Sequence, residues 1–286
     1  MTRLRAEDIE HIAQALKAYD QQLLSRTGHT LKGIACHALG LLEDEFEDIV
    51  NSCRVCVIPL TCGKGVINGF CAVVSDIISH LGLRSFVAQE PNVAGIAQAF
   101  KNRSDIILLA DDYRFVAINV LTGHVSDNTE MTAKGFVAGL DLMAGGLQGE
   151  ETLVIGCGQL GCYTAKILVA TGARISVCDV DPQRALALQR EIMDELKTMI
   201  QIDSGWRSTP GRYSCMIDAT PSADFIDASM ITPDTYVAVP GVPCGLTLEA
   251  RNRLSDRYLH DPLQIGVATM VTDACKPSHA RDSHGF

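Results

Sequence analysis

The chain has 286 residues, and at roughly 150 residues per domain this length predicts about two domains. Its composition, 47% hydrophobic and 20% charged, excludes a disordered chain. The formal net charge of −10 argues against a nucleic-acid partner, and no apolar run is long enough for a membrane span or a secretory signal. We therefore expect a cytoplasmic enzyme with neither a membrane nor a nucleic-acid partner.

The first half of the chain alternates between patterns typical of helices and of buried strands. Apolar residues at steps of three and four predict an amphipathic helix over residues 6–24. The elements predicted after it are a strand at 55–60, a helix ending near His80, a strand at 85–88, a helix at 93–102 and a strand at 105–110. Strands that alternate with helices indicate a parallel sheet with right-handed crossovers.

A long helix over 130–145 is predicted to lead through Gly145 and Gly146 into the second half. This half begins with an apolar strand at 151–155, followed by a helix that reaches about Thr171 and a strand at 174–178. Further strands are expected at 213–217 and 236–239, and a helix that returns to the first half is expected from Gln264.

The turn after the strand at 151–155 carries a dinucleotide-binding pattern. Gly156, Gly158 and Gly161 have the spacing G-x-G-x-x-G, with Gln159 and Leu160 between the last two. Such glycines allow a tight turn, a close approach of backbone amides to a pyrophosphate and close packing of helix on strand. Asp179 follows the next strand, where a carboxylate accepts ribose hydroxyls and repels a 2′-phosphate. The pattern favours NAD, and the alternatives are a flavin or a glycine-rich turn without a ligand.

Two later strand ends are predicted to complete the cofactor site. Thr220 and Pro221 follow the strand at 213–217, and Pro240 and Gly241 follow the strand at 236–239. Ligands of open α/β sheets bind at the carboxyl ends of strands, although ordinary turns have a similar composition. The predicted fold class is α/β, with a C-terminal Rossmann dinucleotide-binding domain and a smaller, half-Rossmann-like N-terminal substrate domain. The predicted boundaries are 1–149 for the substrate domain, 150–276 for the NAD-binding domain and 277–286 for a flexible tail.

Candidates for chemistry in the first half also follow strand ends. Asp111 and Asp112 follow the strand at 105–110, and Cys62 follows the strand at 55–60. A carboxylate here can hold an ammonium group or accept a proton, but it can also simply cap a turn. Cys53 and Cys56 form a single C-x-x-C without a second pair or histidines at zinc spacing, so no metal site is expected.

Several stretches together resemble the pyrrolysine biosynthesis dehydrogenases of the PylD family. They are residues 58–65 with Phe70, 109–112 with Phe115 and Asn119, 156–161, 218–224, 240–244 and 261–266. The resemblance spans most of the chain, although a serine can stand in the family where this chain has Cys62. It implies NAD-dependent, cytoplasmic, homodimeric enzymes that oxidise the terminal amine of 3-methyl-D-ornithyl-N6-L-lysine. Ammonia is then lost and the product cyclises to the pyrroline ring of L-pyrrolysine.

The resemblance also assigns roles to particular residues. It implies that Leu4 forms part of a lid and that Cys62, Asp111 and Asn119 bind the substrate, while Asp111 assists proton loss from the reacting amine. Three alternatives stay open from the residues themselves. They are another NAD-dependent amine or hydroxy-acid dehydrogenase, an NAD-binding sensor without catalysis, and a metal-binding or thiol-redox protein that uses Cys53 and Cys56.

Overall fold

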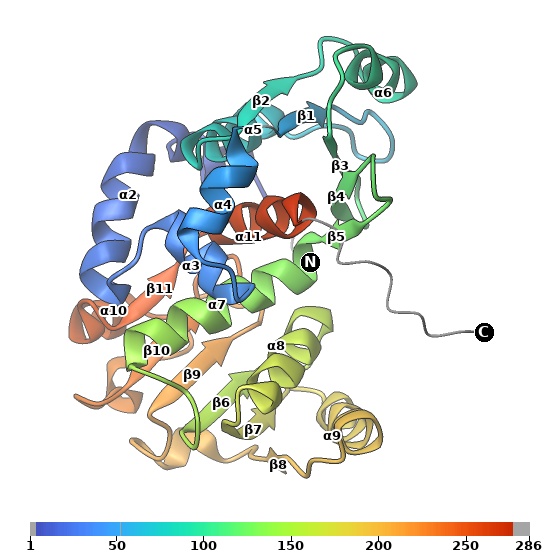
Figure 1. Ribbon diagram of the computed structural model, residues 1–286. Helices are drawn as coiled ribbons and strands as arrows, with labels where there is room; N and C mark the ends of the chain where they lie inside the picture. Colours follow the sequence, from blue (N-terminus) through green and yellow to red (C-terminus); the bar gives the residue numbers. More distant parts are fainter. Residues whose placement is uncertain (1–3, 52, 277–286) are drawn as a thin grey trace.

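Two separate β-sheets form the two halves of the protein (Figure 1). The computed structural model describes residues 4–51 and 53–276. The first sheet has the order β2-β1-β3-β4-β5, with β1 (Arg54–Ile58), β2 (Arg84–Val87), β3 (Ile106–Ala110), β4 (Phe115–Asn119) and β5 (Val125–Asp127). Its first three strands are parallel, and β4 and β5 continue the sheet antiparallel.

The second sheet is parallel throughout and has the order β11-β10-β9-β6-β7-β8. Its strands are β6 (Glu151–Ile155), β7 (Arg174–Cys178), β8 (Gln201–Ile202), β9 (Cys215–Asp218), β10 (Tyr236–Val239) and β11 (Tyr258–His260). The strand order reverses between β6 and β9, which is the arrangement of a Rossmann sheet. The α/β class with a Rossmann half is therefore confirmed, whereas the parallel sheet predicted for the first half holds only for β2, β1 and β3.

Helices cover both faces of each sheet. In the first half, α5 (Phe70–His80) and α6 (Asn92–Lys101) pack on opposite faces. In the second half, α8 (Gln159–Ala170) and α9 (Pro182–Leu196) lie on one face, and α10 (Leu248–Leu254) with the 3-10 turns at Trp206–Ser208 and Ala228–Met230 lies on the other. Sheets buried on both faces carry continuous apolar runs, which is why buried strands such as β1, β3, β6 and β7 were predictable, whereas β4, β5, β8 and β11 were not predicted.

Two long helices connect the halves. α7 (Asn128–Ala144), green in Figure 1, packs against α8 of the second half and against α11 (Gln264–Cys275), drawn in red. A Cβ on Gly135 would lie 2.5 Å from the side chain of Ile265, so this glycine lets α7 and α11 approach closely. α11 also contacts α5 and β4, which confirms the expected return to the first half. The domain boundaries stay a prediction, and the tail at 277–286 lies outside the described residues.

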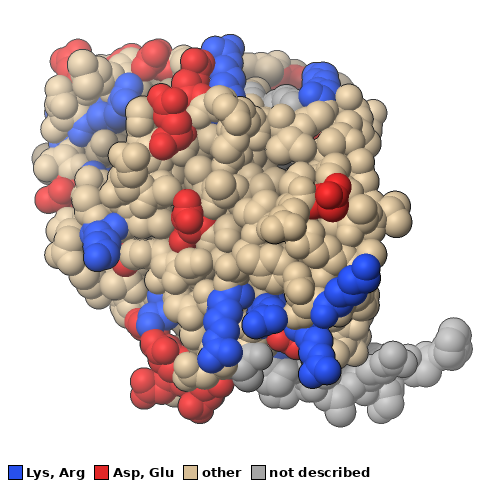
Figure 2. All heavy atoms as spheres, turned by 90° about the horizontal axis from the view of Figure 1, so that it is seen from above, with Lys and Arg blue, Asp and Glu red and all other residues tan. Residues whose placement is uncertain are grey.

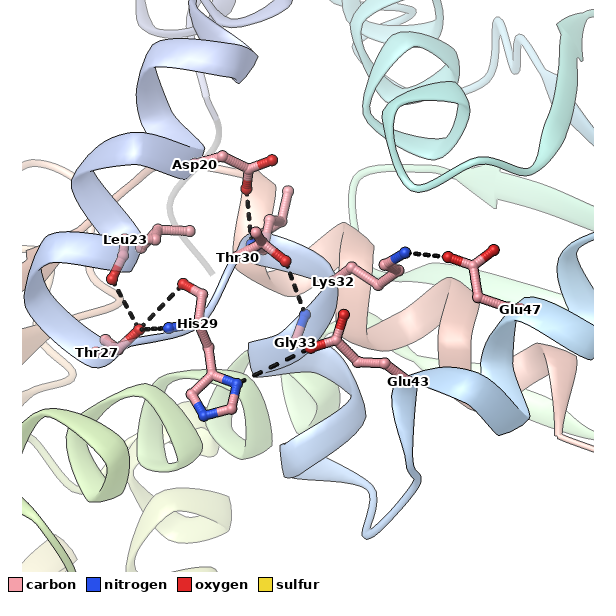
Figure 3. A network of polar contacts seen from close by, with 10 residues as sticks. Asp20, Leu23, Thr27, His29, Thr30, Lys32, Gly33, Glu43 and Glu47 are labelled. Carbon is pink, nitrogen blue, oxygen red and sulfur yellow. Dashed lines mark hydrogen bonds and ion pairs between the residues drawn. The ribbon is translucent and has the colours of Figure 1, made fainter.

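The N-terminal region differs from the single helix predicted at 6–24. It forms α1 (Ala6–Ile9) and α2 (Ile12–Thr27), separated by a turn, and then α3 (Leu31–Ala38) and α4 (Glu43–Val50), which the periodicity did not indicate. Side chains hold these short helices together (Figure 3). Asp20 accepts a hydrogen bond from the Leu31 backbone at 2.8 Å, and Lys32 pairs with Glu47. These short helices therefore depend on neighbours for stability, as isolated helices of this length are marginal.

Charged side chains are unevenly distributed over the surface. Figure 2 looks at the protein from above, and a wide area of this face carries few Lys, Arg, Asp or Glu side chains. α6 lies at the top of Figure 1 and exposes 77% of Val93 and 59% of Phe100. Within the described residues, no helix has the length and apolar character needed to cross a membrane.

Candidate active site between the two halves

A cavity of about 560 Å³ lies between the two halves, at the carboxyl ends of strands from both sheets. Its volume is within the range typical of small-molecule sites. The first half contributes the segments after β1 and β3 and the start of α7, and the second half contributes the glycine-rich loop and the turns after β9, β10 and β11. Polar or charged residues in its wall include Lys64, Asp111, Asp112, Arg114, Asn128, Thr129, Thr132, Gln159 and Thr220.

The glycine-rich loop between β6 and α8 has the shape that phosphate binding requires. Gly156 has a φ of +96°, a conformation that favours glycine. A Cβ on Gly161 would lie 1.8 Å from the Gly156 carbonyl oxygen, so no larger residue fits between loop and helix. A Cβ on Gly158, by contrast, would meet no atom within 4 Å. Nothing in the fold itself therefore requires glycine at 158, and the open space there is available to a ligand at the N-terminus of α8.

Asp179 holds this loop from the end of β7. Its Oδ2 accepts a hydrogen bond from the Cys157 backbone at 2.7 Å, and its Oδ1 accepts one from the Asp181 backbone at 2.9 Å. The half-buried carboxylate thus lies beside the loop, where the sequence predicted it. The loop residues that line the cavity are Gly158, Gln159 and Leu160. The cavity wall does not include Gly156, Gly161 or Asp179, which determine the conformation of the loop.

The turns after β9 and β10 form the opposite side, and all four residues predicted there line the cavity: Thr220, Pro221, Pro240 and Gly241. A Cβ on Gly241 would lie 2.2 Å from the Thr220 carbonyl oxygen, so the two turns are in close contact. Asp218 lies behind them, fully buried, and its Oδ1 accepts bonds from the Thr220 backbone at 3.0 Å and hydroxyl at 2.7 Å. Burial raises the pKa of Asp218 to about 6, although the hydrogen bonds from Thr220 act in the opposite direction and lower it.

Asp111 lines the cavity at the end of β3 and is exposed to it. Its Oδ1 accepts hydrogen bonds from the backbone amides of Tyr113 and Arg114, both at 2.8 Å. These two bonds, from Arg114 first, lower the pKa of Asp111 below the ordinary carboxyl value. The carboxylate is therefore ionised near neutral pH and is better suited to holding a cation than to retaining a proton.

Two basic residues of the cavity wall were missed by the sequence analysis. The backbone amide of Lys64 donates to Asp112 Oδ2 at 2.8 Å. Arg114 donates from Nε and Nη2 to Asp127 Oδ2, at 3.1 and 2.8 Å. Both lie near strand ends, as many surface residues do, and Lys64 also lies within the stretch 58–65 that carries the family resemblance, but neither signal marks a site residue. The wall thus carries side chains of both charge signs.

The remaining predicted substrate residues divide into two groups. Leu4 and Cys62 line the cavity, with Leu4 at the start of the described chain. Asn119 does not, because its side chain has other contacts. Its Nδ2 donates to the Ala274 carbonyl at 2.9 Å, and its Oδ1 accepts from the backbone of Leu121 at 3.0 Å. The predicted role of Asn119 in substrate binding therefore finds no support in this geometry, in which the residue joins β4 to α11.

The C-x-x-C pair does not come together. Cys53 and Cys56 belong to hydrophobic clusters on opposite faces of the first sheet, because successive strand residues alternate between faces. Cys53 Sγ instead lies 3.7 Å from Cys275 Sγ at the end of α11. Among residues 4–51 and 53–276, no group of three or more His, Cys, Asp or Glu side chains is placed to hold a metal ion.

Comparison with known proteins finds relatives along nearly the whole chain. The sequence model of the family described as "Pyrrolysine biosynthesis protein PylD, N-terminal domain" matches residues 8–126. A pyrrolysine synthase of Methanosarcina acetivorans is 30% identical over 95% of this chain and 98% of its own length. Another from Methanosarcina barkeri is 29% identical over 95% of this chain and 97% of its own length.

Solved structures with a similar fold include dehydrogenases. The quinate dehydrogenase from Corynebacterium glutamicum, determined in complex with NAD, has a TM-score of 0.54 and 18% identity over 78% of this chain and 92% of its own. The shikimate dehydrogenase from Aquifex aeolicus has a TM-score of 0.51 and 15% identity over 80% of this chain and 95% of its own. At such identities the likeness confirms the two-domain fold with a Rossmann half and carries no substrate information.

Proposed function

The chain belongs to the family of pyrrolysine synthases, and from this premise we propose that it is a cytoplasmic oxidoreductase that completes pyrrolysine with NAD as cofactor. The reaction is the oxidation of the terminal amine of 3-methyl-D-ornithyl-N6-L-lysine. A hydride leaves the amine-bearing carbon for the nicotinamide and a proton leaves the nitrogen, and water then hydrolyses the resulting imine to an aldehyde and ammonia. The carbonyl carbon that remains condenses with the ornithine α-amine, losing water, and the pyrroline ring forms.

The residues around the glycine-rich loop fit a dinucleotide. The space in front of Gly158 accommodates a pyrophosphate, and the free N–H groups at the start of α8 offer donors to it. The Asp179 carboxylate has remaining lone pairs for the hydroxyls of an adenosine ribose, and its charge disfavours a 2′-phosphate. NAD, when bound, supplies the hydride acceptor, and the turns at Thr220 and Gly241 give it a wall of backbone and small side chains.

Asp111 supports the amine half of the proposal. An ammonium group cannot release a hydride from its carbon, because the nitrogen lone pair must first be free. An ionised carboxylate attracts the ammonium end, positions it and receives its proton directly or through water. Because the pKa of Asp111 is lowered, the proton would pass on to solvent rather than stay. This position of Asp111, in one cavity with the open face of Gly158, is the single observation that carries the proposed function.

Incubation of the purified protein with the synthetic isopeptide and NAD tests this proposal. NADH absorbance should rise, and mass spectrometry should show one pyrrolysine and one ammonia per NADH. NADP in place of NAD should react much more slowly, because of Asp179. If the isopeptide gives no NADH while another amine or a hydroxy acid does, the alternative of a different NAD-dependent dehydrogenase replaces this one.

The proposed homodimer rests on the family resemblance alone. Light scattering of the purified protein measures its mass in solution directly. A mass of about twice 30.8 kDa is expected. A mass close to that of one chain would contradict the expectation without affecting the proposed chemistry.

A further inference from the structure

Cys53 and Cys275 form a pair of thiols that the C-x-x-C pattern did not indicate. Cys53 directly precedes β1, and Cys275 is the last residue of α11. Their sulfur atoms lie 3.7 Å apart, although the two residues are 222 positions apart in the chain. Both are free thiols, and each residue is only 7% exposed. Because the sulfur atoms are already in contact, a small rotation of the two side chains brings them to bonding distance.

Hydrogen bonds of the neighbouring residues hold both thiols in place. On the β1 side, the Arg54 backbone donates to Asp105 Oδ2 at 2.8 Å. On the α11 side, the Ala274 carbonyl accepts from Asn119 Nδ2 at 2.9 Å. These bonds do not involve sulfur, so a reaction of the thiols leaves them intact. Two groups that the fold holds side by side react as if their local concentration were very high.

The reduced pair is stable while no oxidant is present. Contact with Cys53, followed by burial, raises the pKa of Cys275 well above the ordinary thiol value. The thiolate is the reactive form of a cysteine, so Cys275 reacts slowly near neutral pH. Both residues nevertheless keep some contact with solvent, and hydrogen peroxide is small enough to use it.

We propose that hydrogen peroxide converts Cys53 and Cys275 to a disulfide that ties the end of α11 to the start of β1. One thiolate attacks a peroxide oxygen, the O–O bond breaks, and hydroxide leaves and takes up a proton to become water. The sulfenic acid formed is then attacked by the second thiol, which releases a second water molecule. In sum, two thiols lose two hydrogen atoms, and one hydrogen peroxide is reduced to two water molecules.

The bond would stabilise the attachment of the last helix to the first half. α11 packs on α5 and β4 of that half, and its end could not leave the first sheet once the disulfide had formed. A disulfide also restricts the unfolded chain, and the effect grows with the length of the loop that it closes. The described wall of the active-site cavity includes neither thiol. The proposal therefore does not depend on the reaction that the protein catalyses.

Peroxide treatment of the intact protein, followed by digestion without reductant and mass spectrometry, tests the proposal. Wild type should give a linked pair of peptides that contain Cys53 and Cys275, and dithiothreitol should separate them. The thermal midpoint should rise by about 5 °C or more on treatment and return after reduction. Cys53→Ala and Cys275→Ala should each lose the linked peptides and the shift. Cys56→Ala removes the other thiol of the C-x-x-C, and as the matched control it should keep both.

The exposed thiol of Cys62 shows in the same sample that the oxidant has acted. Peroxide is increased until Cys62 is modified, and Cys53 and Cys275 that are still unlinked at that point would overturn the proposal. A bond between Cys53 and Cys56 would overturn it in favour of the sequence pair. Linked peptides without a change of the thermal midpoint would contradict the stabilising tie between α11 and β1.

Discussion

At the scale of single residues, Asp111 shows how a local turn sets chemical behaviour. Its carboxylate is bonded to two backbone amides and is exposed to the cavity, so it is ionised and ready for a cation. The sequence placed Asp111 at the end of a strand. It did not reveal that the backbone bonds make the residue a weaker base, because these depend on how the turn at Tyr113 and Arg114 folds.

Asp111→Asn should lower turnover without affecting NAD affinity. The amide can keep Oδ1 as acceptor for the turn, so the fold is retained, but it cannot attract an ammonium group or take its proton. We expect kcat to fall on the order of 100-fold, with the NAD dissociation constant unchanged. Steady-state kinetics and calorimetry measure the two effects. Asp105→Asn, at the other end of β3, serves as control, and unchanged kcat in Asp111→Asn would contradict its role.

Asp218 should make stability depend on pH. Its pKa is about 6 in the folded protein and near the ordinary carboxyl value when unfolded, so between these values the folded state binds more protons. Stability from this residue is therefore fully present below about pH 4 and is lost as pH rises to about 6. As pH rises from about 4 to about 6, the free energy of unfolding of Asp218→Asn should increase by roughly 1–3 kcal/mol relative to that of the wild type. Urea unfolding at several pH values measures this, and parallel stability curves would refute it.

At the scale of elements, the unit from β6 through α8 to β7 was the most predictable part. Its apolar strands are buried on both faces, and its glycines occur at fixed steps, so local sequence alone specifies it. β4 was missed because the alternating pattern suggested only parallel strands, whereas Phe115–Asn119 turns back antiparallel after a tight turn. α3 and α4 were missed because they are short and held by side chains from their neighbours.

Two glycines of the loop should respond differently to alanine. Gly161→Ala places a methyl group 1.8 Å from the Gly156 carbonyl, so both stability and NAD affinity should fall. Gly158→Ala meets no protein atom within 4 Å, so its free energy of unfolding should change by no more than about 1 kcal/mol. Its NAD affinity should nevertheless fall at least about 10-fold, since the methyl group would occupy the place that we propose for the pyrophosphate. Equal NAD binding by Gly158→Ala and wild type, measured by calorimetry, would exclude this site for the phosphates.

At the scale of the whole molecule, the site exists only where the two halves meet. Lys64, Arg114 and Asn128 come from three separate segments, and no pattern in the sequence groups them with Gly158. Of the residues that the family resemblance named for substrate binding, Leu4, Cys62 and Asp111 line the cavity and Asn119 does not, and their roles stay predictions. Positions that depend on packing between distant segments were therefore the ones that sequence reasoning could not supply.

Leu4 offers a test of closure over the cavity. It is half-buried in the wall and precedes α1, and its predicted role is to form part of a lid that separates the cavity from solvent. Leu4→Ala should raise KM for the isopeptide several-fold and leave the dissociation constant of NAD unchanged. Leu42→Ala, at an exposed leucine before α4, is the matched control. Identical kinetics for wild type and Leu4→Ala would show that this side chain plays no part in closure.

The central claim is that the carbon bearing the terminal amine transfers its hydride to a nicotinamide held at the glycine-rich loop. Isopeptide carrying two deuterium atoms on that carbon tests it most directly, with mass spectrometry of the reduced cofactor as the measurement. We predict one deuterium in every molecule of NADH formed and one left in the pyrroline ring. Reduced cofactor without deuterium, or no reduced cofactor at all, would contradict the account.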